Sequence, residues 1–302
     1  MPNPSSGAAP FEYAEAFSRN LGWVTAQEQA RLRGKRVAIA GLGGVGGFHL
    51  LALARLGVAA FNLAEYDRFE LANFNRQVGA ALSTLGEPKL EVLCAMARDI
   101  NPGVELRRFP EGVTRDNARE FLRDADLYVD GLDYFAFDAR AVTFAACAEL
   151  RVPATTVAPL GMGAALLNFL PGSMTFEEYF GFEGQPDAER ALRFLLGLSP
   201  AMLQRSYLAD ASRVNFDQQR GPSTVAACHL CAGVAAAEAL KILLGRGPVL
   251  AAPWGLHFDA YRNRYKRTWR PWGYRNPLQR LARAIARRQL RQLREMQARP
   301  AP

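Results

Sequence analysis

The sequence has 302 residues, of which 49% are hydrophobic and 22% charged. This composition supplies enough apolar surface for a substantial core and excludes an intrinsically disordered chain. The net charge of +8 is uneven, because 13 Lys and Arg stand against two acidic residues from Gly255 onward. We therefore expect a nearly neutral globular body with a basic C-terminal part. A solvated surface is a commoner role for such a part than nucleic-acid binding, which we do not expect here.

The N-terminus and the cysteines indicate a cytoplasmic protein. Residues 1–10 lack the basic start and the apolar stretch of a signal peptide. Apolar runs elsewhere are interrupted before they reach membrane-spanning length, so we expect no membrane association. Four cysteines in a chain of this length do not make a disulfide framework, which fits a reducing compartment.

The first half of the chain predicts a Rossmann-like α/β fold. Thr25 and Glu28 have the spacing of a capping box and open the first helix of the body. Apolar runs and helix-like segments then alternate, which is typical of a doubly wound parallel sheet with helices on both faces. The predicted strands are 37–40, 59–64, 104–109, 127–129 and 154–157, and the predicted helices are 48–56, 89–100, 117–123 and 137–150.

The pattern changes after Pro159. Residues 164–170 precede a Pro-Gly turn and predict a strand that extends the sheet in the opposite direction. We expect a crossover insertion over a cleft at 175–221, a buried helix at 223–245 and one or two strands at 256–269. An Arg-rich amphipathic helix is predicted at 277–299, with five apolar residues on one side: Leu278, Leu281, Ile285, Leu290 and Leu293. The expected organisation is an N-terminal arm at 1–24, a main domain at 25–254 and a basic extension at 255–302.

A glycine-rich turn lies between the first predicted strand and the following helix. Its glycines are Gly41, Gly43, Gly44 and Gly46. Glycines let the backbone turn tightly and approach a nucleotide, and the helix N-terminus attracts phosphate. Glu65 follows the second strand, where such folds keep an acidic residue for the ribose. These features indicate an adenosine nucleotide, either NAD or ATP.

Three charged residues favour ATP over NAD. Arg76 and Lys89 follow the second strand, and Asp133 follows the strand at 127–129. An adenylating site needs a guanidinium and an ammonium group for the phosphates and a carboxylate for Mg²⁺. An NAD site needs none of these three groups.

Together these motifs resemble the adenylation core of the ThiF/MoeB/HesA family, the bacterial relatives of E1 ubiquitin-activating enzymes. The likeness covers about residues 11–245. It is carried by Phe17–Asn20, Gly41–Gly46, Glu65–Asp67, Asn73–Gln77, Gly86–Lys89, Asp130–Asp133 and Ala237–Gly245. Residues 25–254 then correspond to the family's adenylation domain.

The resemblance implies an ATP-dependent adenylyltransferase. Asn73, Arg76 and Lys89 would contact the triphosphate, Glu65 would bind the ribose and Asp133 would bind Mg²⁺. Asp67 and Gln77 would also belong to the nucleotide site.

The partner and the substrate follow from the same resemblance. Arg19 matches a family arginine that reaches across a two-fold interface, which implies a homodimer. The substrate would be the C-terminal carboxylate of a ubiquitin-like or sulfur-carrier protein similar to ThiS or MoaD. The products would be an acyl-adenylate and pyrophosphate.

Three departures from the family pattern stand out. The segment 175–221 has no cysteine, so we expect no thioester step on this chain. Only one C-x-x-C pair is present, Cys228 and Cys231, within a predicted helix, so we expect no structural zinc. Tyr134 stands where relatives often have Asn. Its side chain could either stack near the adenine or narrow the site.

Two alternatives remain from the sequence. An NAD-dependent oxidoreductase would share the glycine turn and Glu65 but would leave Arg76, Lys89 and Asp133 unexplained. A non-catalytic nucleotide-binding scaffold, which recruits a partner through its basic tail, would fit the missing cysteine.

Overall fold

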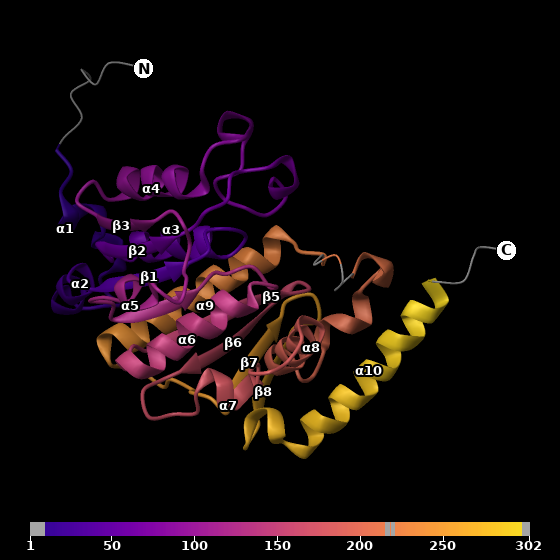
Figure 1. Ribbon diagram of the computed structural model, residues 1–302. Coiled ribbons are helices and arrows are strands. Elements are labelled where there is room, and N and C mark those ends of the chain that lie inside the picture. Colours follow the sequence, from indigo (N-terminus) through magenta and orange to yellow (C-terminus); the bar gives the residue numbers. More distant parts are fainter. Residues whose placement is uncertain (1–9, 215–217, 219–220, 298–302) are drawn as a thin grey trace.

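The fold is built on one eight-stranded mixed sheet (Figure 1). The computed structural model describes residues 10–214, 218 and 221–297, except for the side chains of 289–297. The strand order is β3-β2-β1-β4-β5-β6-β7-β8. The first five strands in this order run parallel, and β6, β7 and β8 are each antiparallel to the preceding strand. The strands are β1 (Arg36–Ala40), β2 (Ala60–Ala64), β3 (Glu105–Phe109), β4 (Leu127–Asp130), β5 (Ala154–Leu160), β6 (Gly163–Phe169), β7 (Trp254–Asp259) and β8 (Arg264–Trp269). The predicted mostly parallel sheet with antiparallel strands added is confirmed.

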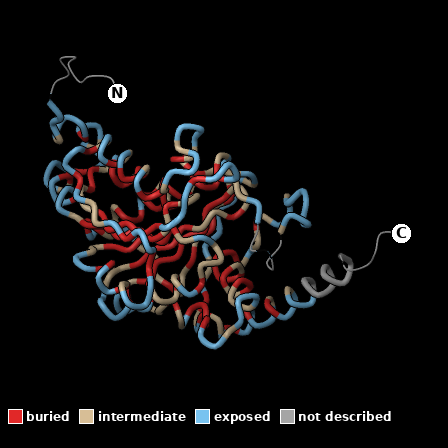
Figure 2. Tube along the Cα trace, turned by 45° about the horizontal axis from the view of Figure 1, so that its top comes forward, coloured by how far each residue is buried: buried red, intermediate tan, exposed pale blue. Residues whose placement is uncertain are grey.

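Helices cover both faces of this sheet, and each face has its own apolar core. Side chains of α3, α4 and α9 pack on one face, whereas those of α5, α6, α7 and α8 pack on the other. Figure 2 shows the buried residues concentrated in the central strands and the helix sides that face them. The α-helices are α1 (Tyr13–Ala16), α2 (Ala26–Arg33), α3 (Gly46–Arg55), α4 (Lys89–Ile100), α5 (Ala118–Phe121), α6 (Phe137–Leu150), α7 (Phe176–Phe180), α8 (Asp187–Leu198), α9 (Val225–Leu244) and α10 (Pro277–Gln297).

The predicted capping box at the start of α2 is present. The Thr25 hydroxyl accepts a hydrogen bond from the Glu28 backbone N–H, and the Glu28 carboxylate accepts one from the Thr25 N–H. Two of the unpaired donors at the helix start are thereby satisfied.

Strand order creates one crevice in the parallel half of the sheet. From β1 the chain proceeds outward through β2 and β3, and then returns to place β4 on the other side of β1. Loops leaving β1 and β4 therefore diverge at the carboxyl ends of these strands, where α/β folds bind ligands. Gly41 follows β1 and Gly131 follows β4, so both lie at this crevice.

The predicted buried helix at 223–245 is confirmed as α9. It is long and apolar enough to cross a membrane, but it packs against β5, β6 and α3. We therefore assign α9 to the core of the fold. The cytoplasmic location remains a prediction.

The C-terminal part first adds two strands to the main sheet and then forms α10. The segment 256–269 forms β7 and β8, which join β6 in the same sheet as β1. The predicted helix at 277–299 is present as α10, and the side chains of Leu290 and Leu293 lie outside the described residues. The same holds for residues 1–9 of the predicted arm and for 215–217, 219 and 220 of the predicted crossover. The division into arm, domain and extension stays a prediction.

Candidate nucleotide-binding site

The glycine turn folds tightly against the loop that follows β4. Gly41 has a φ of +80°, a left-handed conformation that favours glycine. A Cβ on Gly46 would overlap the carbonyl oxygen of Gly41, and a Cβ on Gly131 would lie 2.7 Å from Cα of Gly46. The helix α3 starts here with no side chain capping its first N–H groups. These N–H groups and the helix dipole can receive an anion such as phosphate.

Arg76 and Gln77 lie beside this turn. A Cβ on Gly44 would be 3.9 Å from the Cγ and Cδ atoms of Arg76, and one on Gly43 would be 3.6 Å from Nε2 of Gln77. Gln77 is 8% exposed, and its Oε1 atom has no hydrogen-bond partner among the described residues. A buried acceptor without a partner is costly, and a ligand at the turn can supply the missing donor.

The neighbouring Asn73 and Asn75 fix the backbone around Arg76. Asn73 is buried, and its Oδ1 accepts a hydrogen bond from the Glu70 N–H. Asn75 donates from Nδ2 to the carbonyl of Ser223, just before α9. This contact, which the sequence did not indicate, brings the amino end of α9 to the site, where Cys228 also approaches Gly44.

Glu65 braces the glycine turn from the end of β2. Its Oε2 accepts a hydrogen bond from the Leu42 N–H at 2.7 Å, and its Oε1 accepts from the N–H groups of Tyr66 and Asp67 at 2.9 Å each. The side chain is 7% exposed. A carboxylate has about four acceptor sites, so capacity for a ribose hydroxyl remains.

Lys89 and Asp67 form an ion pair beside Glu65. The Lys89 Nζ lies 3.1 Å from Asp67 Oδ2, and the Lys89 N–H donates to the Asp67 carbonyl. The Lys89 side chain is 6% exposed, whereas that of Asp67 is 52% exposed. The lysine, the first residue of α4, is thereby held at the end of β2.

Asp133 reaches the same edge of the sheet from β4. It is exposed, and its Oδ1 accepts a hydrogen bond from the Phe135 N–H. Partial burial raises the pKa of the Tyr66 phenol, and the carboxylates of Asp67, Glu65 and Asp133 raise this pKa further. Asp133 therefore lies close enough to the Tyr66 phenol, at the end of β2, to influence its ionisation.

Arg140 holds the loop that carries Asp133, and no sequence motif pointed to it. The side chain is 2% exposed. It donates from Nε to Asp130 Oδ2 and from its terminal nitrogens to the carbonyls of Leu132, Asp133 and Tyr134. Asp130, part of the predicted motif, is thus engaged inside the protein, and Asp133 presents the accessible carboxylate.

Tyr134 points toward the crossover segment. Its hydroxyl donates to the Ala191 carbonyl in α8 at 2.6 Å, and its ring contacts that of Phe194. The Tyr134 side chain is thereby anchored to α8.

Arg19 is the one predicted site residue that the structure places away from the glycine turn. It lies in the short 3₁₀ helix η1 (Ser18–Asn20), whose Asn20 donates to the carbonyl of Arg55. Arg55 ends α3, whereas the glycine turn begins it. Ten helical residues, or about 15 Å, separate the two ends.

The predicted absence of zinc concerns Cys228 and Cys231. Both are buried in α9, and burial raises the pKa of each thiol. Across the described residues, no group of three or more His, Cys, Asp or Glu side chains could hold a metal ion.

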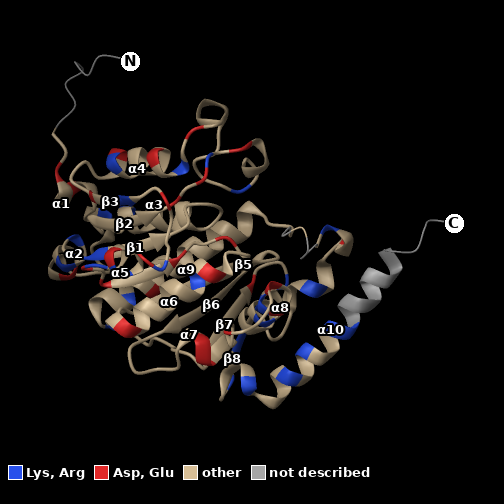
Figure 3. Cartoon of the chain, viewed as in Figure 1, with Lys and Arg blue, Asp and Glu red and all other residues tan. Residues whose placement is uncertain are grey.

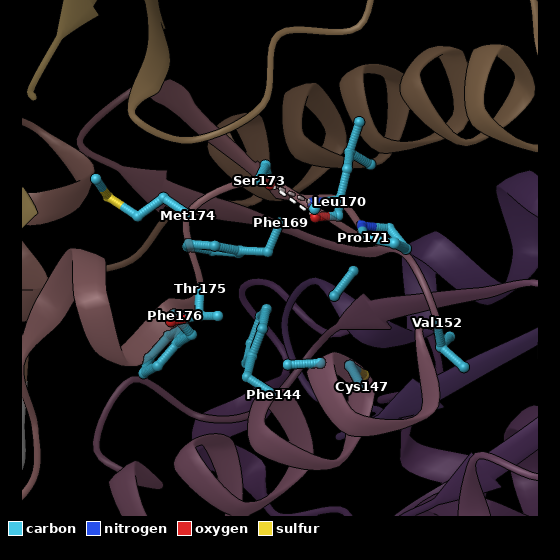
Figure 4. A pocket seen from close by; sticks show the side chains of 13 residues that line it. Phe144, Cys147, Val152, Phe169, Leu170, Pro171, Ser173, Met174, Thr175 and Phe176 are labelled. Carbon is cyan, nitrogen blue, oxygen red and sulfur yellow. Dashed lines mark hydrogen bonds between the residues drawn. The ribbon is translucent and has the colours of Figure 1, made fainter.

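A second hollow, whose lining side chains Figure 4 shows, lies near the start of β5. It has a volume of about 80 Å³ and is lined by residues including Phe144, Cys147, Ala154 and Phe176. Ala154 begins β5, so this hollow is far from the carboxyl ends of the strands. It holds none of the predicted site residues and is too small for a nucleotide.

The arrangement at the carboxyl ends fits ATP with Mg²⁺. The N–H groups of the glycine turn, Arg76 and Lys89 offer donors for phosphate, while the unsatisfied Gln77 oxygen can accept a hydrogen bond from a hydroxyl or amino group of the nucleotide. Mg²⁺ is usually held by one or two carboxylates plus substrate phosphates, a role that the exposed carboxylate of Asp133 suits.

Fold and site together define a nucleotide-binding protein of the Rossmann-like class. A ThiF family model matches residues 17–280, so the chain belongs to the ThiF family. The family inferred from the motifs is thereby confirmed.

Several relatives with different printed activities match parts of this chain. A tRNA threonylcarbamoyladenosine dehydratase of Bacillus subtilis (strain 168) is 37% identical over 118 residues, which is 39% of this chain and 44% of the relative. A sulfur carrier protein adenylyltransferase of Thermus thermophilus is 37% identical over 115 residues, 38% of this chain and 42% of the relative. The heterocyst HesA protein of Trichormus variabilis is 28% identical over 227 residues, 68% of this chain and 84% of the relative. The chain spans about half the length of the first curated relatives it matches.

Solved structures agree on the fold. PaaA has a TM-score of 0.65 at 20% identity, covering 87% of this chain and 85% of PaaA. The Escherichia coli MccB structure with ATP has a TM-score of 0.62 at 17% identity, covering 83% of this chain and 69% of MccB.

Proposed function

We propose that this chain uses ATP and Mg²⁺ to adenylate a carboxylate and release pyrophosphate. The observation that supports it best is the meeting of five features at one edge of the sheet. These are the glycine turn, the unsatisfied Gln77 oxygen, Arg76, Lys89 and Asp133. A dinucleotide site has no use for the last three.

The reaction follows from these groups. A carboxylate oxygen of the substrate attacks the α-phosphorus, a new P–O bond forms, and the bond to the bridging oxygen of the β-phosphate breaks. Pyrophosphate leaves with the electron pair. No proton has to be removed, because a carboxylate is already ionised at pH 7. Arg76 offers a fork to the phosphate oxygens and Lys89 a point charge. Mg²⁺ on Asp133 would neutralise the departing charge.

We further propose that the substrate is the C-terminal carboxylate of a ubiquitin-like or sulfur-carrier protein. The printed name of the Thermus relative supports this choice, whereas the Bacillus relative is named for a tRNA nucleoside. Because residues 175–221 contain no cysteine, the acyl-adenylate would pass directly to its acceptor.

Arg19 supports a homodimer with shared sites. It is exposed and lies beside Asn20, which contacts Arg55 at the end of α3 opposite the glycine turn, and α3 is about 15 Å long. In a two-fold dimer the same surface meets itself, so Arg19 of one protomer can serve the site of its partner.

Exchange of labelled pyrophosphate into ATP tests the proposal. Wild-type protein should catalyse exchange with a ThiS-like or MoaD-like carrier ending in glycine, and a carrier without its last residue should be inert. Arg76→Ala and Asp133→Ala should each reduce the exchange rate about 10²-fold or more. Arg119→Ala is the matched control, since Arg119 is an exposed arginine paired with Glu149 on another part of the surface.

Two other outcomes would overturn the proposal. Binding of ATP without exchange, for every carrier tested, would favour the non-catalytic scaffold. Binding of NAD in preference to ATP would favour the oxidoreductase.

A further inference from the structure

The hairpin of β5 and β6 extends past the edge of the sheet beside the nucleotide site. β5 is the parallel neighbour of β4, and Asp130 at the end of β4 pairs with Thr156. From Thr156, β5 continues four residues further, to Leu160, before Gly161 and Met162 turn the chain into β6. At about 3.3 Å per residue, this turn stands about 13 Å beyond the end of β4. The turn, which we call the hairpin turn, therefore forms a wall on the side of β4 away from β2.

The proposed reaction brings its second substrate to this side. Arg76 and Lys89, the groups for the departing pyrophosphate, lie toward β2, because Lys89 pairs with Asp67 and Arg76 belongs to the loop between β2 and α4. Attacking and leaving oxygens lie roughly in line across the phosphorus. The substrate carboxylate therefore approaches from the side of β4 and the hairpin turn. Figure 3 shows charged residues along the loop between β2 and α4, whereas β5, β6 and the hairpin turn contain none.

Tyr207 ties the hairpin turn to the crossover segment and to β7. It ends the 3₁₀ helix η4 (Leu203–Tyr207), and its hydroxyl accepts a hydrogen bond from the Met162 N–H at 2.8 Å. The same hydroxyl donates to Asp259 Oδ2 at 2.7 Å. A Cβ on Gly161, whose φ is +62°, would overlap the Tyr207 oxygen, so glycine lets the phenol approach the turn. Three separate segments thus meet at one hydroxyl group.

The surroundings of Tyr207 keep this hydroxyl in place. Asp259 is fully buried at the end of β7, and its Oδ1 accepts a hydrogen bond from the Arg262 N–H at 3.0 Å. Burial, together with the Asp259 carboxylate, raises the pKa of the Tyr207 phenol to about 12, so the hydroxyl keeps the proton that it donates. Beyond the turn, the hydroxyl of Thr224 donates to the Gly161 carbonyl at 3.4 Å. The hairpin turn is thereby held from both sides.

We propose that Tyr207 is a positioning residue for the adenylation step. It holds the hairpin turn as the surface along which the C-terminal chain of the substrate lies, so that the carboxylate reaches the α-phosphorus in line. This inference rests on the proposed function. A hydroxyl that only stabilised the fold would affect ATP binding and turnover alike, whereas a positioning hydroxyl affects the turnover of bound substrates and leaves ATP binding unchanged.

Tyr207→Phe tests the proposal on the full chain. It removes the hydroxyl and keeps the ring, whose centroid lies 4.5 Å from that of Tyr261. Pyrophosphate exchange is measured with a ThiS-like carrier ending in glycine, and the rate is divided by the number of ATP-binding sites found by calorimetric titration. We expect the rate per site at saturating carrier and ATP to fall about tenfold or more, while the ATP affinity stays unchanged.

Tyr261→Phe is the matched control. Tyr261 is 66% exposed, so the loss of its hydroxyl should leave both the exchange rate and the ATP affinity unchanged. An unchanged exchange rate in Tyr207→Phe would overturn the inference. An equal loss of ATP affinity and rate would also overturn it, because the hydroxyl would then act through the fold, and so would equal losses of rate in the two variants. If the wild-type chain itself catalyses no exchange with any carrier, the proposed function fails, and this inference fails with it.

Discussion

Arg140 connects the interior of the protein to the proposed metal ligand. Its guanidinium lies over the Phe194 ring and pairs with Asp130, and both charged side chains are almost fully buried. Arg140→Met would leave the Asp130 carboxylate buried without its counter-ion. We expect this change to lower the free energy of unfolding by about 3 to 5 kcal/mol, as measured by urea denaturation.

A milder substitution separates positioning from stability. Arg140→Lys keeps a positive charge for Asp130 but lacks the fork that reaches the carbonyls of Leu132, Asp133 and Tyr134. We expect ATP affinity in EDTA to be unchanged, while the factor by which Mg²⁺ improves that affinity falls. An unchanged Mg²⁺ effect in a folded variant would show that Arg140 does not position Asp133.

His49 gives the protein a built-in sensitivity to acid. It is fully buried in α3, and neither ring nitrogen has a hydrogen-bond partner among the described residues. Burial lowers the pKa of His49 to about 3. The unfolded chain therefore binds a proton more readily than the folded one between pH 6.5 and this value. As the pH is lowered through that window, the free energy of unfolding should fall by about 1.4 kcal/mol per pH unit because of His49.

Chemical denaturation at a series of pH values measures this effect. His49→Leu removes the contribution of this histidine and should reduce the pH dependence of the unfolding free energy between pH 6 and 4. His229→Gln, at an exposed histidine of α9, should retain the wild-type slope. Equal slopes for wild type and His49→Leu would contradict the assignment.

The start of α3 depends on glycine more than the middle of α9 does. A Cβ on Gly46 would overlap the Gly41 carbonyl, whereas one on the exposed Gly233 would meet nothing within 4 Å. We expect Gly46→Ala to lower the unfolding free energy by about 1 to 3 kcal/mol and to abolish detectable ATP binding. Gly233→Ala should raise stability by up to about 1 kcal/mol and leave ATP binding intact. Normal ATP binding by folded Gly46→Ala would argue against a nucleotide at this turn.

Most elements could be predicted from local patterns. Apolar runs flanked by helical periodicity located β1, β2 and α4 within one residue, because burial between two layers leaves a strong signal. The orientation of α10 could not be predicted in this way. Periodicity says which residues share a side, but the acceptors for Gln279 and Arg283 come from segments distant in the sequence.

The candidate site was predictable in part for a similar reason. Strands β1, β2 and β4 are parallel neighbours, so the residues after them meet at one edge. That rule brings the glycine turn, Glu65 and Asp133 together from sequence position alone. Arg140 escaped prediction because its partners are mainly backbone carbonyls, which leave no trace in residue identity.

At the scale of the whole molecule, the position of Arg19 predicts a dimer with sites completed in trans. Arg19→Ala and Arg76→Ala chains should each be inactive in pyrophosphate exchange. Mixing them should restore about a quarter of the wild-type rate, because half of the dimers are mixed and each mixed dimer has one complete site. Light scattering should report a dimer for each chain.

Two results would contradict this arrangement. A monomeric protein with full exchange activity would exclude a shared site. If mixed chains recover no activity despite confirmed exchange of protomers, Arg19 does not contribute to the site of its partner.

Calorimetric titration of ATP with Mg²⁺ and of NAD into the same protein tests the central claim most directly. The account predicts that ATP with Mg²⁺ binds, that NAD binds far more weakly, and that Arg76→Ala and Lys89→Ala each weaken ATP at least about tenfold. Tighter binding of NAD, or ATP affinity that neither substitution changes, would contradict it.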